Sequence, residues 1–423
     1  MMETEIRTYT YDNGEFQRVQ IVRAEKWSDL QFFTPKITPE AFQAMCDVYR
    51  YQMIRVAPMI FGELVLFHIP DDMELPFAVP GIKDRHTAAG IWLRKHWNAP
   101  ETKLFLKQLE ERGFLRIERG KLSVRRIIPY RSAGFLSGCY PEASCKVNAS
   151  FFTFDVLDGD SPYDVFGTPL GLMVKDGKIL NPPLYEREAL IVDKRGNVSV
   201  RQMGLKNISI SIKGTIYERP KRRRTPFARG NDVVIIGDRV IAVHAGGNTI
   251  IPTSGFVIHT DRTDIHPGDR VEYTGLEDVS FAIQAGNSVM VNGQMTDHLV
   301  SRFYNIYHLE PVVFPPCLYP LNFEKGRAPR IMLGADRSGR PVLVWAEGAG
   351  KTGHVPGEES CGASLKELGA IARDIGLYNA VNLDGGGSAQ ILLNNKRALN
   401  VSGRDPLTGM DIERPCANGI MIM

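Results

Sequence analysis

From about residue 170 onward, the chain is a succession of short apolar runs separated by turns that contain glycine. Two short apolar runs on either side of such a turn are the pattern of an antiparallel β-hairpin. The paired runs are 172–174 with 178–180, 189–192 with 198–200, 233–236 with 240–243, and 331–335 with 342–345. Few helical patterns interrupt them. We therefore expect an α+β domain with mainly antiparallel or mixed sheet and few helices, and not a doubly wound fold.

One stretch combines a carboxylate with three glycines and a hydroxyl. It reads Ala-Val-Asn-Leu-Asp-Gly-Gly-Gly-Ser and ends at Ser388, so Asp384 closes an apolar run. Gly385, Gly386 and Gly387 have no Cβ, which lets a ligand approach their backbone N–H groups, and Ser388 adds a side-chain donor. The stretch therefore suits an oxyanion. A P-loop is excluded because no Lys follows the glycines and no helical pattern comes after them. A tight turn that merely needs flexible residues remains the alternative.

The flanks of this glycine loop indicate where it lies. Ser364 and Glu367 form a capping box at the start of a predicted helix over residues 364–375. Short apolar runs at 380–383 and 391–393 then predict buried strands on either side of the glycines. The loop is therefore expected to connect one strand directly to another.

The segment from Asn382 to Ser388 resembles the signature of the phosphodiester glycosidase family. Further segments agree with that family in order, and together with the glycine loop they cover residues 148–418, about two thirds of the chain. These segments are Asn148-Ala149-Ser150-Phe151-Phe152, Ala328-Pro329-Arg330, Ser360-Cys361-Gly362 before the predicted helix, and Arg414-Pro415-Cys416-Ala417-Asn418. One departure concerns the acid of a D-G-R motif: the chain has Glu347 in its place, and the Arg is missing.

The resemblance implies a hydrolase that cleaves the glycosidic C1–O bond of a sugar-1-phosphodiester to a free sugar and a phosphate monoester. A nucleotide-sugar-like or glycosylated phosphate metabolite is the expected substrate. Such a reaction needs negative charge beside the oxocarbenium-like transition state and a group that takes a proton from water. Asp384 is the first candidate for that carboxylate. Glu347 is the second and would complete a carboxylate pair.

The phosphate of such a substrate needs cationic and hydrogen-bonding partners. A guanidinium fork matches two phosphate oxygens, so Arg330 is the first candidate and Arg414 the second. Backbone N–H groups at Gly385 to Gly387, together with Ser388, would complete a phosphate cradle. Asn148 would hydrogen-bond a sugar hydroxyl or orient the catalytic carboxylate. The remaining candidate binding residues are Asn418 and His354, the latter in a polar loop that we expect to form a lid.

Length and composition indicate two domains. The chain has 423 residues, a formal net charge of +3 and 43% hydrophobic residues, which is typical of a globular protein. The boundaries we expect are 1–130 for an accessory domain and 131–423 for the catalytic domain. The acidic first residues lack the pattern of a secretory signal, no apolar run reaches membrane-spanning length, and the six cysteines are scattered. These features predict a cytoplasmic protein with no membrane partner.

The expected accessory domain has an outline typical of a winged helix. A helical pattern over residues 101–112 is followed by alternating residues over 114–124, which indicate a hairpin. Such a domain would be a smaller α/β unit ahead of the catalytic one. Its basic residues offer phosphate contacts to a nucleic acid, but a solvated basic face is the preferred interpretation. They are Arg94, Lys95, Arg116, Arg119, Lys121, Arg125 and Arg126.

We expect neither a cofactor nor a bound metal. The histidines at 244, 259, 266 and 354 lack the spacing of a zinc site. Carboxylates within 155–164 make a divalent cation the alternative, although the segment lacks the Glu and spacing of an EF-hand. Two other functions remain open: a regulatory module that senses a phospho-sugar or binds nucleic acid, and a phosphodiesterase that cleaves the P–O bond.

Overall fold

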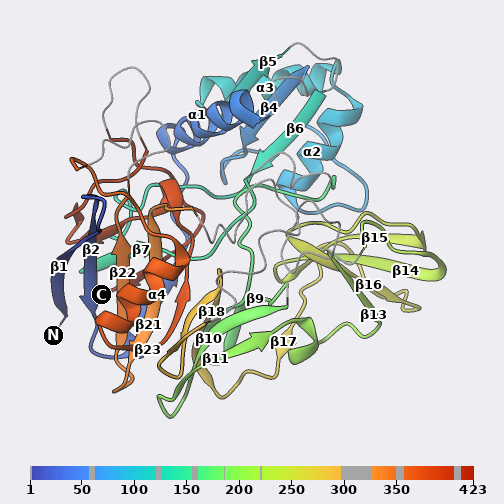
Figure 1. Ribbon diagram of the computed structural model, residues 1–423. Helices are drawn as coiled ribbons and strands as arrows, with labels where there is room; N and C mark the ends of the chain where they lie inside the picture. The colour runs from blue at the N-terminus through green and yellow to red at the C-terminus, as the bar shows by residue number, and fades with distance from the viewer. Residues whose placement is uncertain are drawn as a thin grey trace.

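The structure, a computed structural model, describes residues 2–56, 62–120, 125–154, 161–184, 186–219, 222–296, 326–348, 357–403 and 411–423 (Figure 1). Strands dominate this part of the chain. Its α-helices are α1 (Pro39–Val56), α2 (Arg85–Lys95), α3 (Pro100–Glu111) and α4 (Leu365–Asp374). None of these described helices is both long and apolar enough to cross a bilayer. The expectation of mainly antiparallel sheet with few helices is confirmed.

The largest sheet has seven strands in the order β1-β2-β22-β21-β23-β19-β20, and each neighbouring pair is antiparallel. Its strands are β1 (Glu3–Thr10), β2 (Phe16–Arg23), β22 (Pro341–Ala346), β21 (Arg330–Asp336), β23 (Leu377–Asn382), β19 (Ser288–Val291) and β20 (Gln294–Met295). Helix α4 covers one face, where Leu368 packs in one apolar cluster with Met332. Ile331 and Trp345 belong to the main core on the other face, because side chains of a strand alternate between faces.

A five-stranded antiparallel sheet lies against the same core, in the order β25-β24-β7-β26-β3. Its strands are β25 (Lys396–Arg397), β24 (Ile391–Leu393), β7 (Cys145–Asn148), β26 (Gly419–Ile422) and β3 (Leu30–Phe33). Val147, Ile391 and Ile420 share one buried cluster with Ile331 and Trp345 of the larger sheet. The two sheets therefore enclose a common apolar core.

The predicted hairpins between residues 170 and 345 are confirmed. One sheet has the order β11-β10-β18-β8-β9, another β13-β16-β14-β15, and β12 pairs with β17. Pairing of β8 with β9, β10 with β11, β14 with β15, and β21 with β22 reproduces the four expected hairpins. The strands not yet bounded are β8 (Met173–Lys175), β9 (Lys178–Asn181), β10 (Arg187–Asp193), β11 (Val198–Met203), β12 (Ser209–Ile210), β13 (Thr215–Glu218), β14 (Phe227–Ile236), β15 (Arg239–Gly247), β16 (Gly255–Thr260), β17 (Tyr273–Thr274) and β18 (Val279–Gln284).

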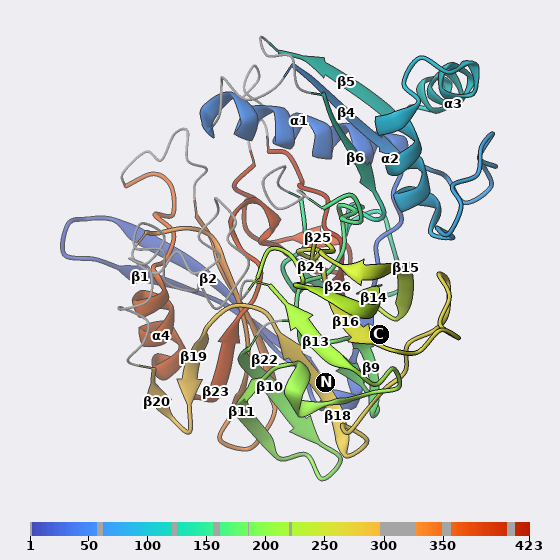
Figure 2. The ribbon, with the colours of Figure 1, turned by 90° about the vertical axis from the view of Figure 1, so that its right-hand side faces the viewer.

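Helices α1 to α3 and a three-stranded sheet form a separate α/β unit, which Figures 1 and 2 show at one end of the molecule. The sheet has the order β5-β4-β6, with β4 (Glu63–His68), β5 (Leu115–Arg119) and β6 (Arg125–Tyr130). Strand β4 pairs antiparallel with β5 and parallel with β6. The expected hairpin over 114–124 is therefore corrected: β4 lies between its two arms. The winged-helix outline loses its wing.

The first 33 residues do not belong to this α/β unit. Strand β2 pairs with β22 from Val19 to Arg23, and β3 pairs with β26 from Leu30 to Phe33. These strands complete the two sheets around the common core, since their apolar side chains are buried there or beneath α4. An accessory domain over residues 1–130 is corrected accordingly. The α/β unit starts at α1, and the segment before it is part of the larger body.

Candidate active site

The glycine loop connects the two sheets that share the core. It leaves β23, makes a short 3-10 turn over Gly386–Ser388 and enters β24. The N–H of Asp384 donates to the carbonyl of Ala149 at 3.0 Å, and the N–H of Gly386 donates to that of Pro329 at 2.9 Å. The first bond ties the loop to the segment after β7, and the second ties it to the residue before β21. Both sheets therefore hold the loop in place.

Asn148, the last residue of β7, fixes the main chain of the loop. Its Nδ2 donates to the carbonyl of Asp384 at 2.6 Å, and its Oδ1 accepts from the N–H of Gln390 at 3.1 Å. The residue is 1% exposed. The amide thus spans both ends of the loop. Of the two roles predicted for Asn148, this geometry matches orientation of the carboxylate and not contact with a sugar.

Asp384 combines burial with partial access to solvent. The Ser388 hydroxyl and the Gly385 N–H donate to its carboxylate, and the Arg414 guanidinium contributes a favourable charge. Burial outweighs these contributions and raises the pKa of Asp384 from 3.8 to about 7. The residue nevertheless keeps part of its surface exposed. A carboxyl group with this pKa exchanges protons readily at neutral pH, which is what general acid–base catalysis requires.

Close packing requires two of the three glycines. A Cβ at Gly385 would lie 2.7 Å from the carbonyl oxygen of Pro329, and a Cβ at Gly387 would lie 2.5 Å from Cζ of Arg414. Gly386 faces open space, but its φ of +60° lies in the left-handed region that favours glycine. The guanidinium of Arg414 therefore packs directly on the loop, beside the catalytic candidate.

The predicted backbone cradle is smaller than expected. The Gly386 N–H is bonded to Pro329, and the Gly385 N–H is directed to the Asp384 carboxylate. These two N–H groups hold the loop together and do not point to a ligand. A phosphate contact from the Gly387 N–H stays a prediction.

The matched region in known proteins covers this site. Residues 142–423 match the phosphodiester glycosidase family. The chain belongs to the phosphodiester glycosidase family. The family comprises hydrolases that act on phosphodiester glycosides. All strands and loops of the candidate site lie within the matched residues, except those that the first 33 residues contribute.

Comparison with solved structures gives distant similarities. The catalytic domain of zebrafish N-acetylglucosamine-1-phosphodiester alpha-N-acetylglucosaminidase, auto-inhibited by its pro-peptide, is 11% identical with a TM-score of 0.40; the match covers 100% of this chain and 82% of that one. A hypothetical protein from Synechocystis is 14% identical with a TM-score of 0.44, and the match covers 100% of this chain but 62% of that one. A putative exported protein from Burkholderia pseudomallei is 15% identical with a TM-score of 0.42, with 100% and 97% covered. No curated protein matches the chain.

Arg330 does not occupy the position expected of a phosphate ligand. It shares a face of β21 with Met332, which packs beneath α4. Its Nε donates to the carbonyl of Ala363 at 3.0 Å, and its Nη2 donates to that of Gly326 at 3.1 Å. The residue is 5% exposed, and burial lowers its pKa to about 10. The prediction for Arg330 is corrected: its guanidinium ties together main-chain segments next to the glycine loop.

Glu347 is likewise occupied by the protein itself. Its carboxylate accepts two parallel bonds from Arg18, at 2.6 Å and 2.7 Å. The hydroxyl of Ser360 donates to the same carboxylate, and the N–H of Asn400 does so at 2.8 Å. Since both oxygens are bonded and the side chain is 3% exposed, the prediction of a second catalytic carboxylate is corrected. Arg18 was not predicted, because it lies far outside the residues that carry the family resemblance.

Asn418 also serves the fold and not a ligand. Its Oδ1 accepts from the N–H of Ser150 at 2.7 Å and from the hydroxyl of the same residue at 3.2 Å. Its Nδ2 donates to the carbonyl of Ser150 at 3.4 Å. Both residues are buried. The prediction of Asn418 as a substrate ligand is corrected, since its amide is bonded to the strand segment that follows β7.

Two further predictions concern residues that the structure does not fully describe. His354, the expected lid residue, lies outside the described residues. The same holds for the acidic residues 155–160. Asp164, from the same acidic segment, accepts from the N–H groups of Thr253 and Ser254 at 3.0 and 3.3 Å. Among the described residues, no cluster of histidine, cysteine and carboxylate side chains has the arrangement of a metal site.

Several basic side chains of the α/β unit are bonded within the protein. Arg116 and Arg125 pair with carboxylates at 2.7 and 2.6 Å. Arg94 donates to a main-chain carbonyl at 2.8 Å, and burial lowers its pKa to about 10. Lys121 lies outside the described residues. Pairing with carboxylates reduces the positive field that a phosphate backbone would meet, so a nucleic-acid partner stays a prediction with less support.

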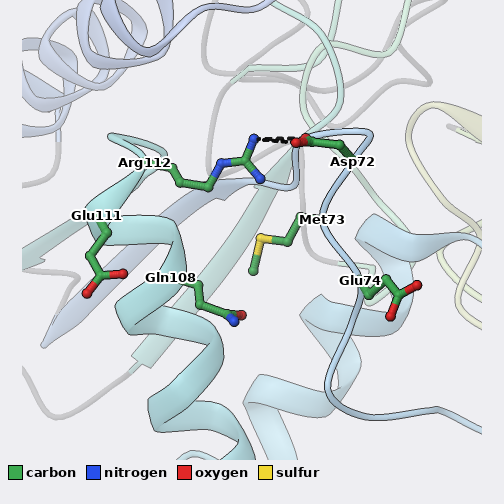
Figure 3. A pocket seen from close by; sticks show the side chains of 6 residues that line it. All are labelled: Asp72, Met73, Glu74, Gln108, Glu111 and Arg112. Carbon is green, nitrogen blue, oxygen red and sulfur yellow. Dashed lines mark hydrogen bonds and ion pairs between the residues drawn. The ribbon is translucent and has the colours of Figure 1, made fainter.

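A hollow of about 310 Å³ in the α/β unit is separate from this site (Figure 3). The residues around it are Asp72, Met73, Glu74, Gln108, Glu111 and Arg112. Its one cation, Arg112, is paired with Asp72 at 2.8 Å. The acidic excess disfavours an anionic substrate there. The glycine loop remains the candidate catalytic centre.

Proposed function

We propose that this protein hydrolyses the glycosidic C1–O bond of a sugar-1-phosphodiester, with a nucleotide-sugar-like or glycosylated phosphate metabolite as substrate. The observation that carries the proposal is the state of Asp384. Burial holds its pKa at about 7 although a hydroxyl, an N–H group and a guanidinium favour its ionised form. Within a family of phosphodiester glycosidases, such a group is the natural proton acceptor for water.

Asp384 acts as general base in this mechanism. Water attacks the anomeric carbon as its proton moves to the carboxylate. The C1–O bond breaks, and its electron pair leaves with the phosphate monoester. The negative charge of Asp384 before proton transfer also stabilises the oxocarbenium-like transition state. The proton then returns to solvent through the exposed part of the residue.

A single catalytic carboxylate is sufficient for this reaction. A phosphate monoester is a good leaving group, so its departure needs little help from a general acid. Glu347, the other carboxylate expected at the site, is held by Arg18 in a buried ion pair. This assignment agrees with chemistry in which only one carboxyl group changes its protonation state.

Arg414 stabilises the leaving phosphate. Its guanidinium packs on Gly387, and its charge acts on the neighbouring Asp384 carboxylate. A planar guanidinium placed there offers two parallel donors to phosphate oxygens. The same cation therefore binds the anionic half of the substrate and keeps part of the catalytic base ionised.

The proposal is tested with a synthetic sugar-1-phosphodiester. Purified protein should release free sugar, and Asp384→Asn should lower kcat by about 10²- to 10⁴-fold, the range expected for loss of a general base. Asp264→Asn is the matched control, because this exposed carboxylate is paired only with Arg262 on the surface. A reaction in oxygen-18 water should place the label in the sugar. Label in the phosphate would show P–O cleavage, and absence of turnover with all substrates would favour a sensing role.

A further inference from the structure

The seven-stranded sheet brings residues of the first hairpin to the end at which Asp384 lies. Arg18 is on β2, and the N–H of Glu347, just after β22, donates to its carbonyl at 3.0 Å. The next two strands, β21 and β23, begin at Arg330 and end at Asn382 beside the glycine loop. Strand order β2-β22-β21-β23 therefore aligns Arg18 with the catalytic end of the sheet.

The Arg18 guanidinium is held in one orientation by a rigid carboxylate. Nε and Nη2 of Arg18 donate to the two oxygens of Glu347 at 2.6 and 2.7 Å. Glu347 is itself fixed by the Ser360 hydroxyl and by the N–H of Asn400 at 2.8 Å. Its side chain is 3% exposed, so it has little freedom to move. A two-point bond to a fixed anion leaves the guanidinium plane little rotation.

One edge of this oriented guanidinium remains open. A guanidinium has five N–H donors, and Glu347 uses only those of Nε and Nη2. Nη1 of Arg18 has no hydrogen-bond partner in the part of the chain that the structure describes, and the side chain is 37% exposed. A purely structural ion pair explains the buried carboxylate. It does not require that donors of its cation face solvent at the catalytic end of the sheet.

The spacing indicates what an anion at Arg18 would be. Three strand spacings separate β2 from β23, which places their backbones about 14 Å apart. Even with the reach of an arginine side chain, this distance excludes direct contact with the phosphate that Asp384 and Arg414 handle. A second anionic group, separated from the scissile phosphodiester by part of the aglycone, fits the interval.

We propose that Arg18 forms an anion subsite for a second negatively charged group on the aglycone, with Glu347 as the positioning residue. The proposal rests on the proposed function for its meaning in catalysis. It adds a residue from outside the matched residues 142–423. The chain lacks the Arg that often follows the acid at the position of Glu347, and the hairpin residue supplies a guanidinium to that acid instead.

A binding experiment tests the subsite without any turnover. Alkanediol bisphosphates of increasing length are titrated into the full-length protein by calorimetry, with alkyl monophosphates as matched ligands. A bisphosphate of suitable length should bind at least about tenfold more tightly than the monophosphate, as expected for one added charge-assisted contact. Equal affinities for both ligand classes at every length would overturn the subsite, whatever the enzyme does to a glycoside.

Variants then assign the effect to Arg18. The double variant Arg18→Gln with Glu347→Gln keeps a hydrogen-bonded pair of similar size and avoids an unpaired buried charge. It should lose the tenfold preference, and Arg18→Lys should retain only part of it, because Lys lacks the fork. Unfolding midpoints show whether each variant is folded. A folded double variant that keeps the full preference would refute the role of Arg18.

Kinetics separate this proposal from the function on which it rests. Two sugar-1-phosphodiesters are compared, one with a neutral alkyl aglycone and one with a phosphorylated aglycone. In the double variant, KM should rise about tenfold more for the second substrate than for the first, with little difference in kcat. Wild-type turnover with no such difference overturns the subsite alone. No turnover of either substrate overturns the proposed hydrolase, while the calorimetric result still decides the subsite.

Discussion

Replacement of Asp384 by Asn should stabilise the fold at alkaline pH and leave its stability nearly unchanged in acid. Burial raises the pKa of this carboxyl from 3.8 to about 7 in the folded protein. The native state therefore keeps a proton that the unfolded chain has lost over this window. The contribution of Asp384 to stability is full below pH 3.8 and is lost as the pH rises through 7. Asn mimics the protonated form at every pH.

The size of the effect follows from the same values. A difference of about three pKa units corresponds to about 4 kcal/mol, at about 1.4 kcal/mol per unit. This value is an upper bound, because water reaches the exposed part of Asp384 and screens its charge. The free energy of unfolding of Asp384→Asn should exceed that of the wild type by about 2–4 kcal/mol near pH 8.5.

Denaturant unfolding near pH 4 and near pH 8.5 measures this difference, with midpoints and slopes fitted for both proteins. Asp264→Asn serves as control, because an exposed ion pair with Arg262 lowers the pKa of Asp264 and gives it the opposite sign of pH dependence. A stability gain of Asp384→Asn that is equal at the two pH values would refute the argument. So would a loss of stability at alkaline pH.

Three further changes have measurable outcomes. Ser388→Ala removes a hydrogen bond that favours the ionised form of Asp384, so the pH midpoint of kcat/KM should move up by about one unit; an unmoved midpoint in pH–rate profiles would contradict the assignment of the base. Gly387→Ala places a Cβ 2.5 Å from Cζ of Arg414, so kcat/KM should fall about 10²-fold without loss of fold by circular dichroism. Ser364→Ala breaks the capping box of α4 and should cost about 1 kcal/mol in urea unfolding.

Local signals in the sequence were sufficient for much of the fold. The capping box at Ser364 and Glu367 begins α4 as predicted, because a cap depends only on residues within one helical turn. The four hairpins marked by glycine turns also formed. The hairpin predicted over 114–124 did not, because β4 enters between its arms from about 50 residues earlier. No periodicity within 114–124 contains that information.

The candidate site shows a similar division. Asp384 and Arg414 were predicted, and the structure places both at the glycine loop. Arg330, Glu347 and Asn418 share the same motifs, yet the protein itself occupies their polar groups. A motif marks which side chains the fold requires near the loop. Whether a polar group faces a ligand or a neighbouring strand depends on partners that are distant in sequence.

Strands β2 and β3 have a consequence for biosynthesis. They leave the ribosome first, but their partners β22 and β26 are among the last segments to be made. Arg18 and Glu347 are separated by 329 positions, so at about 5–20 residues per second the first hairpin waits roughly half a minute for its neighbour. During translation its apolar strands are exposed, while the α/β unit that follows them can already fold. Holdase chaperones would therefore find their target at the very start of this polypeptide.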